Sequence, residues 1–295
     1  MKPTDLLNPR YVWERRARIG SKLFDLGRQS ARRLGIPTSE SDRKIKAVRG
    51  IHTGSRAFIL GNGPSLRIAD LDRLQGELTF ASNKIYLAFD QTAWRPTYYF
   101  VFDRLVAKNN AEVIQRLPLT KFFSDDVRHL LGGARDAVWL HELWRNEVVQ
   151  HRADGRPTEC AGYFSEDALY GVDAGWTVIY SQLQIAFHMG ITEVYLLGVD
   201  FSFDVPAKTV STNERGYGTA LESKGEVNHF HPDYRKPGEI WAVPRLDCQK
   251  LTFELARQHY EQAGRKIFNA SRQTKLEVFP RADFDRVLPV SAAVP

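Results

Sequence analysis

The stretch Arg56-Ala-Phe-Ile-Leu-Gly-Asn-Gly-Pro-Ser-Leu66 decides the fold class of this chain. Its apolar run over 57–60 is typical of a strand buried in a parallel sheet, and residues 66–74 suit a short helix. Two glycines in the turn between them let the backbone approach a phosphate, and the first amides of a helix attract an anion. Pro64 fits the first turn of that helix. The pattern therefore predicts a nucleotide-binding crevice. An ordinary tight turn is the alternative, because neither the full dinucleotide fingerprint nor a Walker loop is present.

Strands and helices alternate along the rest of the chain. Further strands are predicted at 78–81, 98–102, 121–123, 137–140, 193–198 and 266–268, and helices at 176–189 and 246–262. The connection over 202–244 is polar, rich in Gly and Pro, and long enough to indicate a functional lid. We therefore predict an α/β fold with a Rossmann-like, doubly wound, mainly parallel sheet, a lid insertion and an N-terminal helical arm.

The distribution of charge divides the chain into two parts. Residues 1–50 hold 13 Lys/Arg against 5 Asp/Glu, a net charge of +8, whereas the remaining residues hold 28 against 30, a net charge of −2. We predict a basic helical N-terminal extension over 1–50 and a Rossmann-like nucleotide-binding catalytic domain over 51–295, which includes the lid. A basic charge confined to the extension argues against nucleic acid as a partner.

The extension admits two interpretations. Residues 1–36 have the pattern of a basic amphipathic helix, and 36–42 resemble a linker. Such a helix can lie on an anionic membrane surface, or it can pack on the body with a solvated basic face. No apolar run reaches the ~20 residues of a membrane span, and no signal-peptide core is evident. We predict a cytoplasmic protein, with peripheral contact at the inner face of the membrane as one interpretation.

Only two cysteines are present, Cys160 and Cys248, and their spacing is not that of a metal site. Distant cysteines in an otherwise unremarkable soluble composition are typical of a reducing compartment, so we expect no disulfide.

Polar residues follow several of the predicted strands. The turn of Gly61, Asn62, Gly63, Pro64 and Ser65 follows the first strand, and Asn83, Asp103 and Asp200 follow three others. Ligands bind at the carboxyl ends of the strands in such sheets, so we assign these residues to a nucleotide site, together with Thr177 at the start of the predicted helix over 176–189. Any single one of them can instead be a helix cap without a chemical role.

The lid contains residues that could carry out catalysis. His229 and His231, followed by Tyr234, could supply a general base near neutral pH. Two histidines without further ligands are poor support for zinc, so we predict no metal site. The neighbouring side chains of Tyr217, Tyr234, Arg235 and Lys236 could stabilise a departing phosphate.

Several segments together resemble two related groups of proteins. The segments are 58–66, Asn83, 182–201, the stretch from 228 to 271, and 276–279. One group is the bacterial CMP-sialic-acid-dependent sialyltransferases that act on lipooligosaccharide. The other comprises the motility-associated-factor glycosyltransferases and the MptE-like 6-hydroxymethylpterin diphosphokinases, which the C-terminal segments resemble more closely. The resemblance runs through most of residues 56–280 and leaves out the N-terminal arm.

The resemblance to the sialyltransferases implies that Asn62, Gly63, Ser65 and Asn83 lie at the nucleotide and that His229 or His231 is the catalytic base. This chain departs from the pattern in two places. Asp103 stands where that family has an Asn, and Ser202 and Phe203 stand where it has tyrosines. The leaving nucleotide would then depend on Tyr234 or Arg235, and Asp103 facing Asp200 would suit a divalent cation, which a diphosphokinase needs.

Three functions follow from this reading of the sequence. The first is a glycosyltransferase that uses a nucleotide-activated sugar, with a CMP-sialic-acid-like donor favoured, and a glycan or lipid-linked acceptor, in cell-envelope polysaccharide or lipooligosaccharide assembly. A lid histidine would act as the general base, and we predict no cofactor besides the nucleotide-sugar donor, with Mg²⁺ needed only under the alternative. The alternative is a Mg²⁺-dependent 6-hydroxymethylpterin diphosphokinase, and the third is a nucleotide-binding module without turnover.

Overall fold

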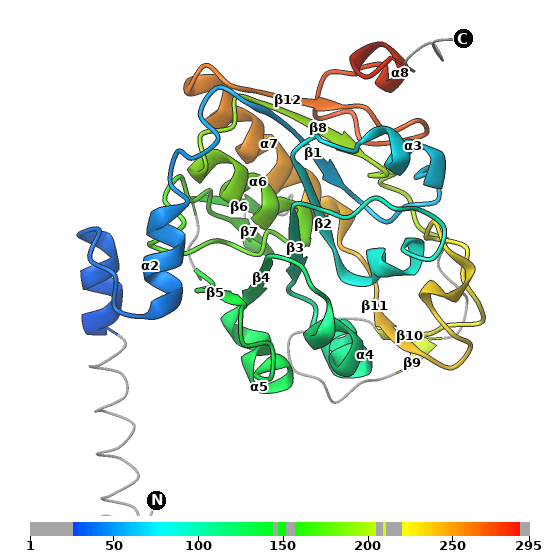
Figure 1. The fold of residues 1–295 in the computed structure, drawn as a ribbon, viewed down its shortest axis with the longest axis horizontal. Coiled ribbons are helices and arrows are strands. Elements are labelled where there is room, and N and C mark those ends of the chain that lie inside the picture. Colours follow the sequence, from blue (N-terminus) through cyan, green and yellow to red (C-terminus); the bar gives the residue numbers. More distant parts are fainter. Residues whose placement is uncertain (1–25, 144–146, 152–156, 205–208, 211–219, 290–295) are drawn as a thin grey trace, which may run out of the picture.

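A parallel sheet of seven strands forms the centre of the molecule (Figure 1). The computed structural model describes residues 26–143, 147–151, 157–204, 209–210 and 220–289. The strands follow the order β12-β8-β1-β2-β3-β4-β5, and every neighbouring pair is parallel. Their bounds are β1 (Arg56–Leu60), β2 (Thr79–Ser82), β3 (Tyr98–Val101), β4 (Lys121–Ser124), β5 (Val138–Leu140), β8 (Glu193–Leu197) and β12 (Lys266–Asn269). The predicted α/β fold with a doubly wound parallel sheet is confirmed.

Helices cover both faces of this sheet, because successive residues of a strand point to opposite sides. Ala57 and Ile59 of β1 belong to the core that also includes residues of α6 (Val178–His188) and α7 (Leu246–Gln262). Phe58 and Leu60 belong to the opposite core. That core includes residues of α3 (Ile68–Arg73), α4 (Arg104–Arg116), α5 (Arg128–Leu131) and α8 (Phe284–Val287). The residues of β1 from 57 to 60 are all apolar because both faces of the strand are buried.

The direction in which the chain builds the sheet reverses at β1. Strands β2 to β5 are added on one side of β1, whereas β8 and β12 are added on the other. The loops that follow β1 and β8 therefore diverge at the carboxyl edge, which is where doubly wound sheets bind their ligands. The strand order alone places the turn at 61–65 and residue Asp200 beside each other at this point.

The predicted lid is not a purely irregular connection. Within the described part of 202–244, β9 (Thr209–Val210), β10 (Ala220–Glu222) and β11 (Ile240–Ala242) form an antiparallel sheet. The single-turn helix η4 (Pro232–Tyr234) lies between β10 and β11. A second hairpin, β6 (Val148–His151) with β7 (Pro157–Gly162), packs on α7. We did not predict either small sheet, because their strands are short and carry no clear alternation.

The N-terminal region is packed against the body as far as the structure describes it. Residues 26–33 are helical, and α2 (Glu40–Ala47) packs beside β5. The predicted linker is wrong in its second half, because Ser39 caps α2 and Asp42 is buried in an ion pair with Arg32. The part of the predicted arm over 1–25 lies outside the described residues. No helix in the described part of the chain is both long and apolar enough to cross a membrane.

The expectation that the chain has no disulfide is wrong. Cys160 of β7 and Cys248 in the first turn of α7 are bonded to each other, with their Cα atoms 4.8 Å apart. Their separation of 88 residues gave no sign of this, because the contact arises only when the β6–β7 hairpin packs on α7. Trp176 contacts both of the segments that the disulfide joins. Its indole N–H donates to the carbonyl of Ala161 (3.3 Å), and its own carbonyl accepts from Gln249 (3.1 Å).

Candidate active site

The glycine turn after β1 is held against the end of β8 by backbone contacts. The amide of Gly61 donates to the carbonyl of Leu197 (2.8 Å), and the amide of Gly63 donates to that of Gly198 (2.9 Å). A Cβ at Gly61 would lie 2.3 Å from the carbonyl oxygen of Gly198, and one at Gly63 would lie 2.7 Å from the same atom. These glycines are therefore required by the close approach of two backbone segments, a cause the sequence does not reveal.

Asp200 fixes the far side of this turn. Its carboxylate accepts a hydrogen bond from the amide of Ser65 (2.8 Å) and another from the Ser65 hydroxyl. Burial raises the pKa of Asp200 above its ordinary value, although both bonds from Ser65 oppose the shift. The amide of Ser65 is thus taken by Asp200. Since α3 begins only at Ile68, Pro64 does not occupy the first helical turn as predicted.

Three buried oxygens lie unpartnered at the ends of β1 and β2. The side-chain amide of Asn62 donates to the carbonyl of Ser82 (3.2 Å), which joins the two strand ends. Asn62 Oδ1, Ser82 Oγ and Asn83 Oδ1 are buried and have no hydrogen-bond partner in the described structure. Asn83 also has a left-handed backbone, with φ of 54°. Because a buried acceptor without a partner costs about 1–3 kcal/mol, these atoms mark a place where a ligand could bind.

The lid is folded over these strand ends. The amide of Phe230 donates to the carbonyl of Asn62 (2.9 Å). The Lys84 side chain is 7% exposed, and its ammonium group donates to the carbonyl of Tyr234 (2.7 Å) and pairs with Glu239 (2.8 Å). Lys84 lies in η2 (Asn83–Ala88), directly after β2, so a buried ion pair ties the lid to the sheet. Neither Lys84 nor Glu239 could be singled out from the sequence.

His229 faces a buried carboxylate in the lid. Its Nδ1 lies 3.0 Å from Oε1 of Glu226, and the side chain of Glu226 is almost fully buried. The imidazole stacks on the ring of Tyr234, with the ring centroids 3.7 Å apart and an angle of 5° between the planes. Burial lowers the pKa of His229; Glu226 opposes this shift, and Arg235 adds to it. His229 is therefore neutral at pH 7, with one nitrogen directed at a carboxylate, as a general base requires.

The other predicted lid residues have different surroundings. His231 Nδ1 accepts the amide of Asp233 (3.1 Å) and so caps η4. The guanidinium of Arg235 lies 3.7 Å from the centre of the Trp241 ring, and Glu226 is 4.0 Å away. Lys236 is exposed, and Tyr217 lies outside the described residues. The geometry thus distinguishes the two histidines, because within the described part of the lid His229 faces a carboxylate and His231 does not.

Tyr234 is buried beside Asn83. Burial raises its pKa well above the ordinary value for a tyrosine, while Arg235 and a hydrogen bond from Asn83 act in the opposite direction. Its hydroxyl therefore stays protonated at neutral pH and can donate a hydrogen bond.

Asp103 and Thr177 both cap helices. Asp103 accepts from the amides of Leu105 (2.7 Å) and Val106 (3.1 Å) at the start of α4, and Thr177 accepts from Ile179 (3.4 Å) at the start of α6. Strands β3 and β8 are three positions apart in the sheet, a separation of about 14 Å. The carboxylate of Asp103 already accepts from two amides of α4 and that of Asp200 from Ser65, so a shared cation would have to displace these hydrogen bonds. In the described residues, the potential ligand cluster is Cys160, Asp247 and Cys248, and its two sulfurs are bonded to each other.

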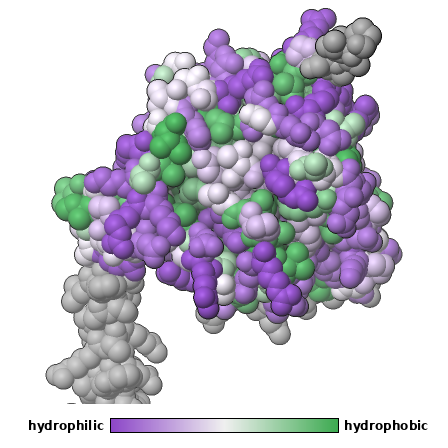
Figure 2. Space-filling model, in the orientation of Figure 1, coloured by the Kyte–Doolittle hydropathy of each residue, from purple (hydrophilic) through white to green (hydrophobic). Residues whose placement is uncertain are grey.

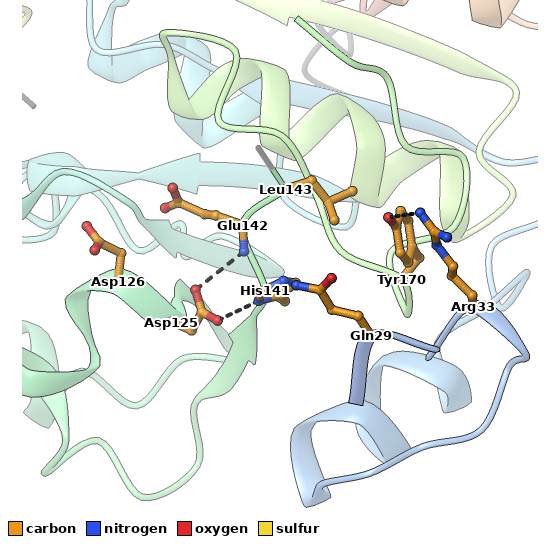
Figure 3. A pocket seen from close by; sticks show the side chains of 8 residues that line it. All are labelled: Gln29, Arg33, Asp125, Asp126, His141, Glu142, Leu143 and Tyr170. Atoms are coloured by element: carbon orange, nitrogen blue, oxygen red, sulfur yellow. Dashed lines mark hydrogen bonds and ion pairs between the residues drawn. The ribbon is translucent and has the colours of Figure 1, made fainter. Parts of the chain in front are cut away.

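A cavity of 360 Å³ lies farther along the same edge, beyond the ends of β4 and β5 (Figure 3). Its walls are Gln29, Arg33, Asp125, Asp126, His141, Glu142, Leu143 and Tyr170. Figure 3 shows Gln29 and Arg33 reaching it from the N-terminal helix, with Arg33 bonded to the Tyr170 hydroxyl (3.0 Å). The sequence did not indicate this cavity.

Two carboxyl groups, the half-buried Glu142 and the buried Asp173, lie near one another at this cavity. Burial raises the pKa of Glu142, with the charges of Asp125 and Asp126 adding to the effect and Ser124 opposing it. Burial also raises the pKa of Asp173 to about 7; the amide of Gly175 opposes this shift, and Glu142 adds to it. Both groups therefore favour the protonated form more than ordinary carboxyl groups do.

The comparisons with known proteins yield distant similarities. A scan against models of known families finds no match, and neither does a search of characterised proteins. Among solved structures, the chain is similar to a MAf glycosyltransferase from Magnetospirillum magneticum AMB-1, with 15% identity and a TM-score of 0.44 over 85% of this chain. The chain spans 40% of the length of that protein.

A second similar structure is the sialyltransferase CstII from Campylobacter jejuni, solved in complex with the substrate analogue CMP-3FNeuAc. It has 15% identity and a TM-score of 0.41 over 77% of this chain and 85% of CstII. Neither substrates nor residue roles pass from these two proteins to this chain at such values.

Proposed function

We propose that the protein is a glycosyltransferase that uses a nucleotide-activated sugar in cell-envelope polysaccharide or lipooligosaccharide assembly. One observation carries the proposal: unpartnered buried oxygens of Asn62, Ser82 and Asn83 lie at the edge of the sheet where a lid presents His229 against Glu226. Donor groups of a nucleotide would satisfy these oxygens. The resemblance in the sequence favours a CMP-linked, sialic-acid-like donor.

In this proposal His229 is the general base. Its Nδ1 faces Glu226, so Nε2 would accept the proton of the acceptor hydroxyl. The hydroxyl oxygen bonds to the anomeric carbon as the bond from that carbon to the phosphate oxygen breaks. Glu226 would stabilise the imidazolium that forms. Both Nδ1 of His229 and Oε2 of Glu226 are buried without a well-formed hydrogen bond, a geometry that can tighten when substrate binds.

The leaving nucleotide would be stabilised from the lid. Arg235 is next to Tyr234 and is mostly buried, so its charge acts in a medium less polar than water. Asn62 and Asn83 would contact the nucleotide directly, and Gly63 stays a candidate contact, although its amide already donates to the carbonyl of Gly198. Ser65 and Asp200 would instead hold the turn in place, because their polar atoms already bond to each other. Asp103 and Thr177 are retained as candidate nucleotide contacts.

The partners that follow are a nucleotide-sugar donor and a glycan or lipid-linked acceptor, without a cofactor. A lipid-linked acceptor would bring the enzyme to the inner face of the membrane as a peripheral protein. This placement is consistent with the basic N-terminal region.

The test is a donor-consumption assay with CMP-, UDP- and GDP-sugars, using mass spectrometry to detect free nucleotide and glycosylated product. His229→Ala is expected to reduce turnover by about 10²–10⁴-fold, the usual contribution of a general base. His231→Ala is the matched control, because it lies two residues away and caps a single helical turn. Full activity of His229→Ala would eliminate the mechanism.

Ligand binding separates the remaining functions. A nucleotide that binds only the folded state raises the apparent stability, so stabilisation by CMP without metal supports the glycosyltransferase. Stabilisation by ATP only with Mg²⁺, together with transfer of pyrophosphate to a hydroxymethylpterin, would instead assign the diphosphokinase. If the wild type forms no product from any donor, and nucleotide binding survives the loss of both histidines, the protein would be a nucleotide-binding module without turnover.

A further inference from the structure

Two exposed apolar side chains of the N-terminal region lie at the turn between its two helices, while a third, Leu26, lies at the start of the first helix. Leu34 is 77% exposed and Ile36 is 53% exposed, on either side of Gly35. Figure 1 places this turn at one edge of the molecule, beyond β5 and remote from β9, β10 and β11. Figure 2 shows hydrophobic colour at the outer end of this region, directly beside strongly hydrophilic residues. We call residues 34–36 the apolar tip.

The apolar tip is held in shape by polar contacts behind it. Arg32 donates to Asp42 (2.9 Å), and both side chains are buried. Asp42 also accepts from the amide of Thr38 (2.8 Å) and from its hydroxyl (2.6 Å). Although burial opposes the charge, Arg32 and Thr38 hold the pKa of Asp42 well below its usual range. A buried ion pair thus fixes the turn, while the side chains of Leu34 and Ile36 point to water. Exposed apolar side chains of this kind do not stabilise the core.

One cation lies at the apolar tip, within a region of net positive charge. The ammonium group of Lys46 donates to the carbonyl of Gly35 (2.8 Å), which places a cation at the turn itself. Arg43 is exposed and lies three residues before Lys46 in α2, so the two share a face of the helix. Residues 26–50 hold seven Lys/Arg against two Asp/Glu, a net charge of +5. Apolar side chains flanked by cations are the combination that binds the surface of an anionic bilayer.

We propose that the apolar tip, with Arg43 and Lys46, docks on an anionic lipid bilayer. A protein partner fits less well, because two side chains cover only a small part of the ~800 Å² that each partner buries in a stable interface. In a bilayer these side chains would enter the interfacial region while the cations meet lipid phosphates. The proposal rests on the peripheral placement in the proposed function, and vesicle binding is measured separately from turnover at the active site.

The test is co-sedimentation of the full-length chain with vesicles of phosphatidylcholine alone or mixed with phosphatidylglycerol. The wild type is expected to bind the anionic vesicles, and to bind less as salt is raised. The variant L34S/I36S is expected to lower the partition coefficient by at least about tenfold, because burial of one such side chain is worth about 10–100-fold. Arg43→Gln with Lys46→Gln is expected to weaken binding to anionic vesicles only.

Val113→Ser is the matched control, since Val113 is 46% exposed on α4 and lies outside the N-terminal region. It should bind vesicles like the wild type, and circular dichroism should show that all variants remain folded. The proposal is overturned if the full chain ignores anionic vesicles, if L34S/I36S binds undiminished, or if Val113→Ser loses as much. A dimer in light scattering that dissociates in L34S/I36S would instead assign the apolar tip to a second copy of the chain.

Discussion

Breaking the bond between Cys160 and Cys248 is expected to destabilise the protein strongly. The bond connects β7 to the first turn of α7, and it closes a loop that contains α6, β8 and the lid. A cross-link of this kind acts mainly by restricting the unfolded chain, so its effect grows with the number of residues enclosed. Reduction by a phosphine leaves the sequence unchanged and is therefore the cleanest perturbation.

The magnitude follows from the separation of 88 residues. In the chain-entropy model a loop of that length removes about 15 cal/mol/K from the unfolded state, or about 4.6 kcal/mol at 25 °C. Typical domains have a free energy of unfolding of about 5–15 kcal/mol, so a third or more of the stability is at stake. With a urea dependence of about 3 kcal/mol/M, the midpoint of unfolding should fall by about 1.5 M.

The assay is urea unfolding followed by tryptophan fluorescence, with and without reductant. A variant with both cysteines changed to Ala is the matched control, because its midpoint should already be low and should not respond to reductant. Alkylation before reduction should label no thiol in the wild type. Two labelled thiols in untreated protein, or a midpoint that moves by less than about 0.3 M on reduction, would refute the reasoning.

Three further outcomes are expected. Glu226→Gln should lower turnover about tenfold or more and shift the acidic limb of kcat/KM to lower pH, because the carboxylate raises the pKa of His229; an unchanged pH profile would contradict this. The pKa of Asp173 is raised to about 7 in the folded protein, so stability should fall by about 3 kcal/mol as pH rises from 4 to 7. Asp173→Asn should remove most of that dependence in urea titrations at several pH values. Gly63→Ala should destabilise by about 2–3 kcal/mol in the same assay, since its Cβ would meet Asp200 at 2.7 Å, while Gly27→Ala, with nothing within 4 Å, should not.

Local patterns were sufficient to predict the central sheet. The apolar run of β1, the turn after it and the amphipathic helix α7 each carry a signal within a few residues, and the structure confirms them. Short antiparallel strands such as β10 and β11 pair across a long connection and bury only one face in part. Their pattern is therefore too weak to separate from a loop. The same limitation concealed the disulfide, whose partners meet only through tertiary packing.

The sequence was sufficient to predict where the candidate site lies, but not which of its residues bond to each other. Because strand ends share one edge of a parallel sheet, Asn62, Asn83 and Asp200 could be placed there from the sequence. The bond between Ser65 and Asp200 depends on the register of β1 against β8, which no local pattern encodes. Glu226 lacked a signal, because a lone acidic residue in a polar loop is usually solvated.

The contact between the glycine turn and the end of β8 bears on how remote relatives could be recognised. Gly61 and Gly63 pack on Gly198, and a Cβ at Gly198 would itself lie 2.8 Å from the carbonyl oxygen of Gly61. A side chain at any of the three positions would force the first strand away from its neighbour. The motifs Gly-Asn-Gly and Gly-Val-Asp thus form a single joint search pattern, and a candidate relative that keeps one without the other must pair these strands differently.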